Sequence, residues 1–239
     1  FFNHIGMPSL DAGFDGPYGV YHSVLDNYFW MIRFGDPGFL YHTAMVRVWG
    51  LLAYRMANAD ILPFEESPYP ADVKQYLDDL EKSAGTGPPG ASAGVTRTRP
   101  DGVRAPALPD LADLRAAIAE WEKAAADLDA GVAAALGSDG GASSGGGARP
   151  SPATLAKVNA ALMQAERDLL DPAGIPKRPW FHHLIYAPLP TYAAETLPGL
   201  REAVEDNDAA RARAQSKALA AAIRARTATV KRGWEVLGR

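Results

Sequence analysis

The stretch from Asp110 to Leu136, DLADLRAAIAEWEKAAADLDAGVAAAL, decides the fold of this chain. Its larger apolar residues recur after three or four positions, with charged and small residues between them. This spacing places one apolar stripe along a helix, which is what a bundle helix presents to its neighbours. Asp110 is the expected N-cap, because its carboxylate can accept the first free backbone N–H groups. The stripe consists of Leu111, Leu114, Ile118, Trp121, Ala125, Leu128, Val132 and Leu136.

Four further segments have helical spacing, so the sequence predicts a mainly α fold. Asp36-Pro37 and Ser151-Pro152 each open a helix with an N-cap followed by proline in the first turn. A shorter helix lies around residues 73–80, and the last one runs from about residue 209 to residue 237. The residues expected to face inward on these helices are Tyr41, Met45, Val48, Leu52, Met56, Val73, Tyr76, Leu77, Leu80, Leu155, Val158, Leu162, Ala165, Leu169, Leu219, Ile223, Val230, Trp234 and Leu237.

The chain is irregular between these helices. Residues 85–109 and 137–150 are rich in Gly, Pro and Ser and predict two linkers. Residues 1–36 and 171–199 are rich in aromatic residues as well, and a short strand is expected near Met7–Leu10. Exposed aromatic clusters of this kind mark contact surfaces, so we expect both segments to pack against another part of the protein. Local patterns tend to break at functional sites, which makes these two segments the candidates.

Composition excludes several functional classes. The 239 residues carry 24 Lys and Arg against 28 Asp and Glu, and the net charge of −4 does not favour nucleic acid as a partner. The absence of cysteine excludes disulfides, thiolate metal sites and cysteine nucleophiles. The chain contains no membrane-spanning apolar run and begins Phe1-Phe2-Asn3-His4, without a signal pattern. We therefore expect it to be the C-terminal portion of a longer polypeptide.

Five histidines are the candidate metal ligands and proton carriers. His22 lies on a glycine-hinged loop between aromatic residues, and from the residues alone it is either a metal ligand or a packing residue. His42 is expected at a helix surface or an interface, while His182 and His183 are each expected to make a structural hydrogen bond. The chain contains no HExxH, no glycine-rich phosphate loop and no GxSxG motif. The arginines expected on the solvated face of the last helix are Arg211, Arg213, Arg224 and Arg226.

Motifs in the two irregular segments resemble the glutamate carboxypeptidase II and transferrin receptor family. The matching pieces follow the order of the family and cover the chain apart from the two linkers. They are Gly16–Val24, Tyr28–Trp30, Phe34–His42, Ala59–Phe64, Leu170–Pro176, Arg178-Pro179, His183–Pro188 and Thr196–Gly199. The resemblance implies that residues 1–36 end an α/β zinc-peptidase domain. It also implies that residues 37–239 form a helical-bundle dimerisation domain, in which residues 171–199 return to the active site.

The resemblance also implies particular site residues. Family enzymes bind two zinc ions, which activate a shared water and polarise the peptide carbonyl, and they use a glutamate as base. His22 matches the last zinc ligand, and Tyr21 matches a tyrosine that contacts substrate. The remaining ligands and the base would lie upstream, so we expect no catalytic residue in this chain and no activity from it alone. Tyr192 matches the segment that reads the C-terminal residue of the substrate, and Thr191 replaces the lysine of glutamate-specific members.

The implied function is that of a di-zinc metallo-exopeptidase acting on small peptides. Its specificity should be neutral or broad, because Thr191 replaces a lysine and residues 1–32 contain no Lys or Arg to pair with acidic side chains. The implied partners are a peptide substrate, an upstream peptidase domain and a second copy in a two-fold homodimer. The resemblance further implies a membrane-anchored protein with this part in the lumen or outside the cell. The alternatives are a non-catalytic, receptor-like binding or sorting protein and a stand-alone helical interaction module.

Overall fold

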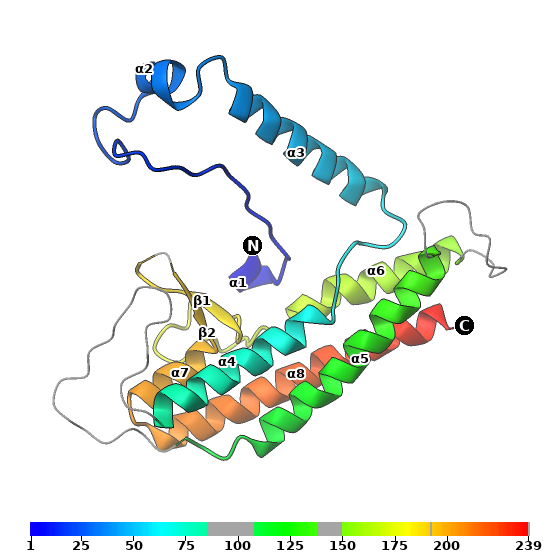
Figure 1. Ribbon diagram of the computed structural model, residues 1–239. Coiled ribbons are helices and arrows are strands. Elements are labelled where there is room, and N and C mark those ends of the chain that lie inside the picture. Colours follow the sequence, from blue (N-terminus) through cyan, green and yellow to red (C-terminus); the bar gives the residue numbers. More distant parts are fainter. Residues whose placement is uncertain (86–107, 138–149, 192, 239) are drawn as a thin grey trace. The chain divides into compact units, whose positions relative to one another are not determined.

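The computed structural model describes residues 1–85, 108–137, 150–191 and 193–238 (Figure 1). The predicted linkers at 85–109 and 137–150 therefore lie, apart from their ends, outside the described residues. The chain divides into two compact units, one formed by residues 1–8 and 64–239 and the other by residues 9–63. The domain boundary predicted at residue 36 stays a prediction.

Helices dominate the larger unit, and the predicted mainly α fold is confirmed (Figure 1). Its central element is α8 (Ala209–Leu237), along which α5 (Ala112–Leu136), α6 (Pro152–Arg167) and α7 (Pro198–Glu205) pack. Another long helix, α4 (Pro68–Gly85), packs against α5. The bounds predicted for the last helix agree with those of α8.

The core of this unit is built from the stripes that the spacing predicts. Trp121 and Leu114 of α5 are fully buried, together with Leu77 of α4 and Ile223 of α8. Full burial of such side chains stabilises a fold by roughly 1.5–3 kcal/mol each. Among the described residues, the other large side chains with almost no exposure are Leu80, Leu128, Leu169, Ile175, His183, Ile185, Leu197 and Leu200.

The stripes of α5 and α8 leave the core at their C-terminal ends, which corrects part of the prediction. Leu136 and Trp234 are exposed, and Leu237 is half-buried. Trp234 lies over Gly131 of α5, where a Cβ atom would stand 3.2 Å from the indole ring. The absence of a side chain at Gly131 lets the indole rest on the outside of α5 instead of pointing into the core.

Capping explains where the long helices begin. Ser151 is the N-cap of α6, as predicted, and its hydroxyl accepts the backbone N–H of Thr154 at 3.2 Å. Asp208 caps α8 in the same way through the N–H of Arg211. Asp110 accepts the N–H of Ala112 at 2.9 Å, but the helix begins one residue later than predicted, with Leu111 in the cap position.

Short elements complete the larger unit. The N-terminal turn α1 (Phe2–Ile5) precedes the long helices, and an antiparallel hairpin joins β1 (Tyr186–Pro188) to β2 (Ala194–Thr196). The strand predicted near Met7–Leu10 is wrong: this stretch is irregular. The ring of Pro8 removes a backbone donor from the middle of it, and neither described strand pairs with it.

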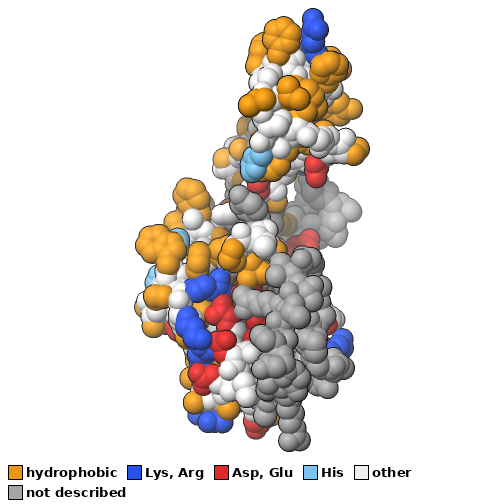
Figure 2. Space-filling view, turned by 90° about the vertical axis from the view of Figure 1, so that its left-hand side faces the viewer, with side chains coloured by type: hydrophobic (Ala, Val, Ile, Leu, Met, Phe, Trp, Pro, Cys, Tyr) orange, Lys and Arg blue, Asp and Glu red, His pale blue; other side chains and the backbone are white. Residues whose placement is uncertain are grey.

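The unit of residues 9–63 contains α2 (Tyr28–Trp30), a π-helical turn η1 (Met31–Gly35) and the long helix α3 (Leu40–Asn58). The predicted helix begins later than Asp36, because Gly38 and Phe39 both have positive φ angles and turn the chain first. None of the residues of α3 is buried. Of its predicted inward face, Met45, Leu52 and Met56 are half-buried, whereas Tyr41 and Val48 are exposed. Figure 2 shows hydrophobic side chains gathered on the surface of this unit, in the upper part of the view.

No helix in the described part of the chain is both long enough and apolar enough to cross a membrane.

Candidate functional site

The loop that carries His22 presents its ring at the surface. The backbone of His22 has φ +62°, a left-handed conformation that is uncommon for residues other than glycine and that often marks functional sites. The hydroxyl of Ser23 donates to the carbonyl of Val20 at 2.7 Å and closes the turn around His22. The imidazole stacks on the exposed ring of Tyr21 with centroids 3.9 Å apart. The two residues predicted on this loop therefore lie together.

The described residues do not form a metal centre by themselves. No group of three or more His, Asp or Glu side chains among them is arranged to hold a metal ion. Zinc sites need three or four ligands, so His22 fits such a site only as one ligand among others. Within the described parts of the chain, neither ring nitrogen of His22 has a hydrogen-bond partner.

Asp36 has a different role in the same unit, at the beginning of α3. Its carboxylate accepts the N–H groups of Tyr41 and His42, and His42 Nδ1 lies 2.7 Å from it. Burial raises the pKa of Asp36, but these hydrogen bonds lower it further, to about 2. The ring of His42 is thus held as a structural group at a helix surface, as predicted.

Thr191 belongs to the larger unit, where it is exposed on the turn of the hairpin. Tyr192, the other predicted site residue, lies outside the described residues. The turn is closed by one bond from the N–H of Leu189 to the carbonyl of Ala193, at 2.8 Å. Each strand has only three residues, so the hairpin offers a short base for this turn.

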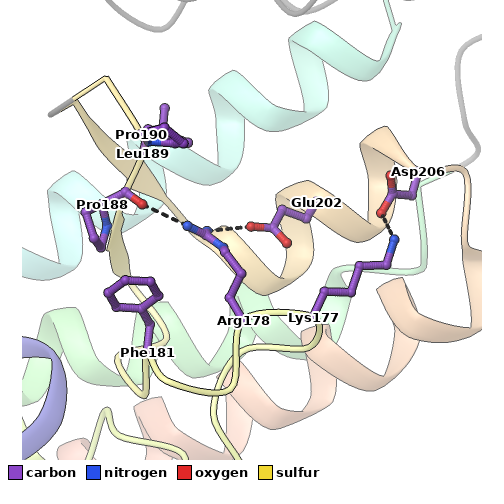
Figure 3. Close-up of a pocket in the computed structure, with 8 residues that line it drawn as sticks. All are labelled: Lys177, Arg178, Phe181, Pro188, Leu189, Pro190, Glu202 and Asp206. Atoms are coloured by element: carbon purple, nitrogen blue, oxygen red, sulfur yellow. Dashed lines mark hydrogen bonds and ion pairs between the residues drawn. The ribbon is translucent and has the colours of Figure 1, made fainter.

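A pocket of about 470 Å³ lies beside this hairpin (Figure 3). One wall is charged: Lys177 reaches Asp206, the C-cap residue of α7, at 2.6 Å, and Arg178 pairs with Glu202 of α7. The apolar remainder of the lining comprises Phe181, Pro188, Leu189 and Pro190. The cationic groups of Lys177 and Arg178 are both engaged by carboxylates of the chain. The lower part of Figure 2 likewise shows acidic and basic side chains interleaved.

Arg178 connects three separate segments at this pocket. Its Nη1 donates to the carbonyl of Pro188 at 2.8 Å, and its Nη2 lies 2.7 Å from the carboxylate of Glu195 on β2. The same nitrogen pairs with Glu202, as Figure 3 shows. Both carboxylates are largely withdrawn from solvent, with 4% and 11% of their side chains exposed.

His183, just before β1, connects the chain to α6 in the bundle core. Its ring is fully buried, and Nδ1 accepts the N–H groups of Ile185 and Tyr186. Nε2 therefore carries the proton and donates to Glu166 of α6 at 2.8 Å. The ring of Phe2 stacks on it with centroids 4.3 Å apart. The structural hydrogen bond predicted for His183 is confirmed, as is that of His182, whose Nδ1 lies 2.8 Å from the carbonyl of Asp171.

Arg226 corrects the prediction that the arginines of the last helix are solvated. Only 4% of it is exposed, and its guanidinium pairs with Glu66 at 2.7 Å and Glu166 at 2.9 Å. The rings of Tyr69 and Trp121 lie over the guanidinium at 4.6 and 4.9 Å. We call these residues, with His183, the buried network.

The charges of the buried network explain its pKa shifts. Burial raises the pKa of Glu166, but the hydrogen bond from His183 and the charge of Arg226 lower it below its usual range. Burial lowers the pKa of Arg226, and its two carboxylate partners raise it above the ordinary value. Burial raises the pKa of Tyr69. The network therefore holds a paired guanidinium and two carboxylates inside the core.

Sequence reasoning missed Glu66, Glu166 and Arg226 as a group. The three are far apart along the chain: Arg226 follows Glu66 by 160 residues and Glu166 by 60. The only signal was position: Arg226 falls three residues after Ile223 and four before Val230, on the apolar face of α8.

Comparison with known proteins agrees with this architecture. Residues 109–231, which span α5, α6, the hairpin, α7 and most of α8, match the model of the transferrin receptor-like dimerisation domain. The chain belongs to this family. The family recognised from the motifs is thereby confirmed.

Individual relatives carry peptidase names. The chain is 31% identical over 208 residues to a protein of Arabidopsis thaliana named probable glutamate carboxypeptidase LAMP1, covering 86% of the chain and 26% of that protein. It is 31% identical to a probable glutamate carboxypeptidase of Arthroderma benhamiae, covering 88% of the chain and 26% of the relative. It is 26% identical to aminopeptidase NAALADL1 of Mus musculus, covering 85% and 25%. The chain thus spans about a quarter of the length of these relatives, and their names place it in a peptidase family.

Proposed function

We propose that this chain serves as the helical, dimer-forming part of a di-zinc metallo-exopeptidase that hydrolyses small peptides. In this role it supplies one zinc ligand, His22, and three residues of the substrate pocket, Tyr21, Thr191 and Tyr192. The other zinc ligands and the general base come from a peptidase domain of the same protein, and a second copy completes a two-fold homodimer. The chain alone has no catalytic activity.

The presentation of His22 is the observation that carries this proposal. Its ring is exposed on a turn with a strained backbone, and its nitrogens are unoccupied among the described residues. Three of the other described histidines have hydrogen-bonded rings: His42 bonds to Asp36, His183 to Glu166 and His182 to the carbonyl of Asp171. The names of the relatives support peptide hydrolysis.

A non-catalytic, receptor-like binding or sorting protein is the second candidate. It is favoured by the family model itself, whose description names the transferrin receptor and dimerisation rather than catalysis. Such a protein has no use for an unengaged histidine at position 22, so His22 separates the two candidates.

The test is substitution of His22 in the complete protein. We expect His22→Ala to lower the bound zinc per subunit and to reduce turnover of dipeptide substrates by more than about a hundredfold, because even residues behind the ligands change metal affinity by that much. His42→Ala is the matched control. It removes a histidine of the same unit whose ring is hydrogen-bonded to Asp36. Unchanged zinc content and turnover in the His22→Ala protein would support the receptor-like candidate.

The substrate panel of that experiment also tests specificity. Because Thr191 replaces a cation and residues 1–32 carry none, we expect apolar dipeptides to be hydrolysed at least as well as acetyl-aspartyl-glutamate. The comparison of kcat/KM for the two substrate classes decides this. A clear preference for the acidic peptide would contradict neutral or broad specificity.

A further inference from the structure

The hairpin that carries Thr191 is too short to hold its own turn in place. Its strands pair over three residues each, and an isolated two-stranded hairpin is at best marginally stable in water. Pro188, the last residue of β1, has no N–H to give to the ladder. The position of residues 189–191 therefore depends on contacts from outside the hairpin.

Arg178 supplies those contacts on the side of the pocket. From one guanidinium it reaches Pro188 at the end of β1, Glu195 in the middle of β2 and Glu202 on α7 (Figure 3). These partners lie on both strands and on the neighbouring helix. The bonds therefore hold the two strands to each other and to α7. Charged hydrogen bonds to largely buried carboxylates are stronger than neutral ones.

The loop that carries Arg178 is itself ordered by backbone hydrogen bonds. The N–H of Arg178 donates to the carbonyl of Ile175 at 2.9 Å, and the N–H of Ile175 donates to the carbonyl of Phe181 at 2.8 Å. The guanidinium of Arg178 also lies over the ring of Phe181, with its carbon 5.6 Å from the ring centroid. Arg178 therefore projects from an ordered loop toward the hairpin.

We infer that Arg178 is a positioning residue that holds the turn at Leu189–Thr191 for substrate, acting through Pro188 and Glu195. This inference rests on the proposed function for the role of Thr191 in substrate binding. Arg178 itself need not touch the substrate, because its terminal nitrogens are already bound to the hairpin and α7.

The experiment compares Arg178→Gln and Arg178→Lys with a matched control, Arg115→Gln. Arg115 also binds two carboxylates, those of Asp78 and Glu81, but it connects α4 to α5. Amide hydrogen exchange is measured at Leu189, Thr191 and Ala193 in the 239-residue chain, and kcat and KM are measured in the complete protein. Circular dichroism checks that each variant keeps its helices.

We expect Arg178→Gln to speed exchange at the turn at least tenfold and to lower kcat/KM by about ten- to hundredfold, mainly through KM, as small misplacements of substrate-binding groups do. Arg178→Lys should fall between, because one nitrogen cannot reach three acceptors. Arg115→Gln should change neither the exchange rate at the turn nor kcat/KM. Should Arg178→Gln fail to fold, Arg178→Lys gives the same comparison.

Unchanged exchange at the turn in a folded Arg178 variant would overturn the inference, as would faster exchange with unchanged kcat/KM. A complete wild-type protein that hydrolyses no peptide would instead refute the proposed function. The exchange measurement does not depend on hydrolysis, so the two failures are distinguishable.

Discussion

Arg226 is stable inside the core because its surroundings replace the water that it loses. Glu66 and Glu166 balance its charge, Trp121 donates to Glu66 at 2.8 Å, and two aromatic faces cover the guanidinium. Each partner depends on the others, since a buried carboxylate without its cation is costly. The buried network is therefore a single unit of stability rather than a set of separate bonds.

We predict that Arg226→Leu lowers the free energy of unfolding by about 3–5 kcal/mol, because it leaves two buried carboxylates unpaired. Arg224→Leu is the control: this arginine is on the same helix but pairs with Asp113 in solvent. Surface pairs of this kind add little to stability, so the control should behave as wild type. Urea denaturation of the 239-residue chain measures both, and equal midpoints for the two variants would contradict the prediction.

At the scale of elements, the loop that leads to Arg178 depends on one glycine. Gly174 has φ +72°, and a Cβ atom there would lie 2.3 Å from the carbonyl oxygen of Pro179. Both the backbone conformation and the close approach exclude a side chain. This glycine lets the chain reverse after α6 and return as the segment that carries Arg178 and His183.

Gly174→Ala is predicted to destabilise the chain by more than the 1–2 kcal/mol or so that a left-handed residue costs by itself. Gly137→Ala is the comparison, because Gly137 also has a positive φ but no atom stands within 4 Å of its added Cβ. Thermal unfolding should show the larger drop for Gly174→Ala. Similar melting temperatures for the two variants would show that Pro179 moves aside without cost.

Periodicity predicted the helices well, because apolar spacing reports directly which side of a helix faces the core. The stripe of α5 from Leu111 to Leu128 and the cap at Ser151 are confirmed on that basis. The late start of α3 could not be read in this way, since it depends on the turn at Gly38 and Phe39. The buried role of Arg226 depends on Glu66, 160 residues away, which no local pattern contains.

The candidate site was predictable only in part, and for a related reason. His22 stood out through its glycine and aromatic neighbours on the loop. In the structure its ring stacks on that of the adjacent Tyr21. Arg178 did not stand out, because its importance lies in partners at 188, 195 and 202 that folding brings together. Motifs thus indicated residues that a ligand would meet, whereas residues that hold them required the structure.

At the scale of the whole molecule, the proposed function assigns dimer formation to this chain and catalysis to the complete protein. We predict that the purified chain of residues 1–239 forms a particle of about twice the mass of one chain, because its matched family model is a dimerisation domain. The same preparation should show no metal-dependent hydrolysis of dipeptides, since one histidine cannot hold a catalytic metal. Light scattering and a peptidase assay with added zinc measure the two, and measurable hydrolysis would overturn the division.

The buried network also sets an order of events during synthesis. Glu66 comes early in the chain, whereas Arg226 comes 160 residues later, in the second half of α8. Until the ribosome has added Arg226, Glu66 and Glu166 lack the guanidinium with which they pair, and Trp121 lacks the helix against which it packs. The central packing of α4, α5 and α6 must therefore wait for the final helix to emerge, and a chain stopped before Arg226 would be left for chaperones and proteases to handle.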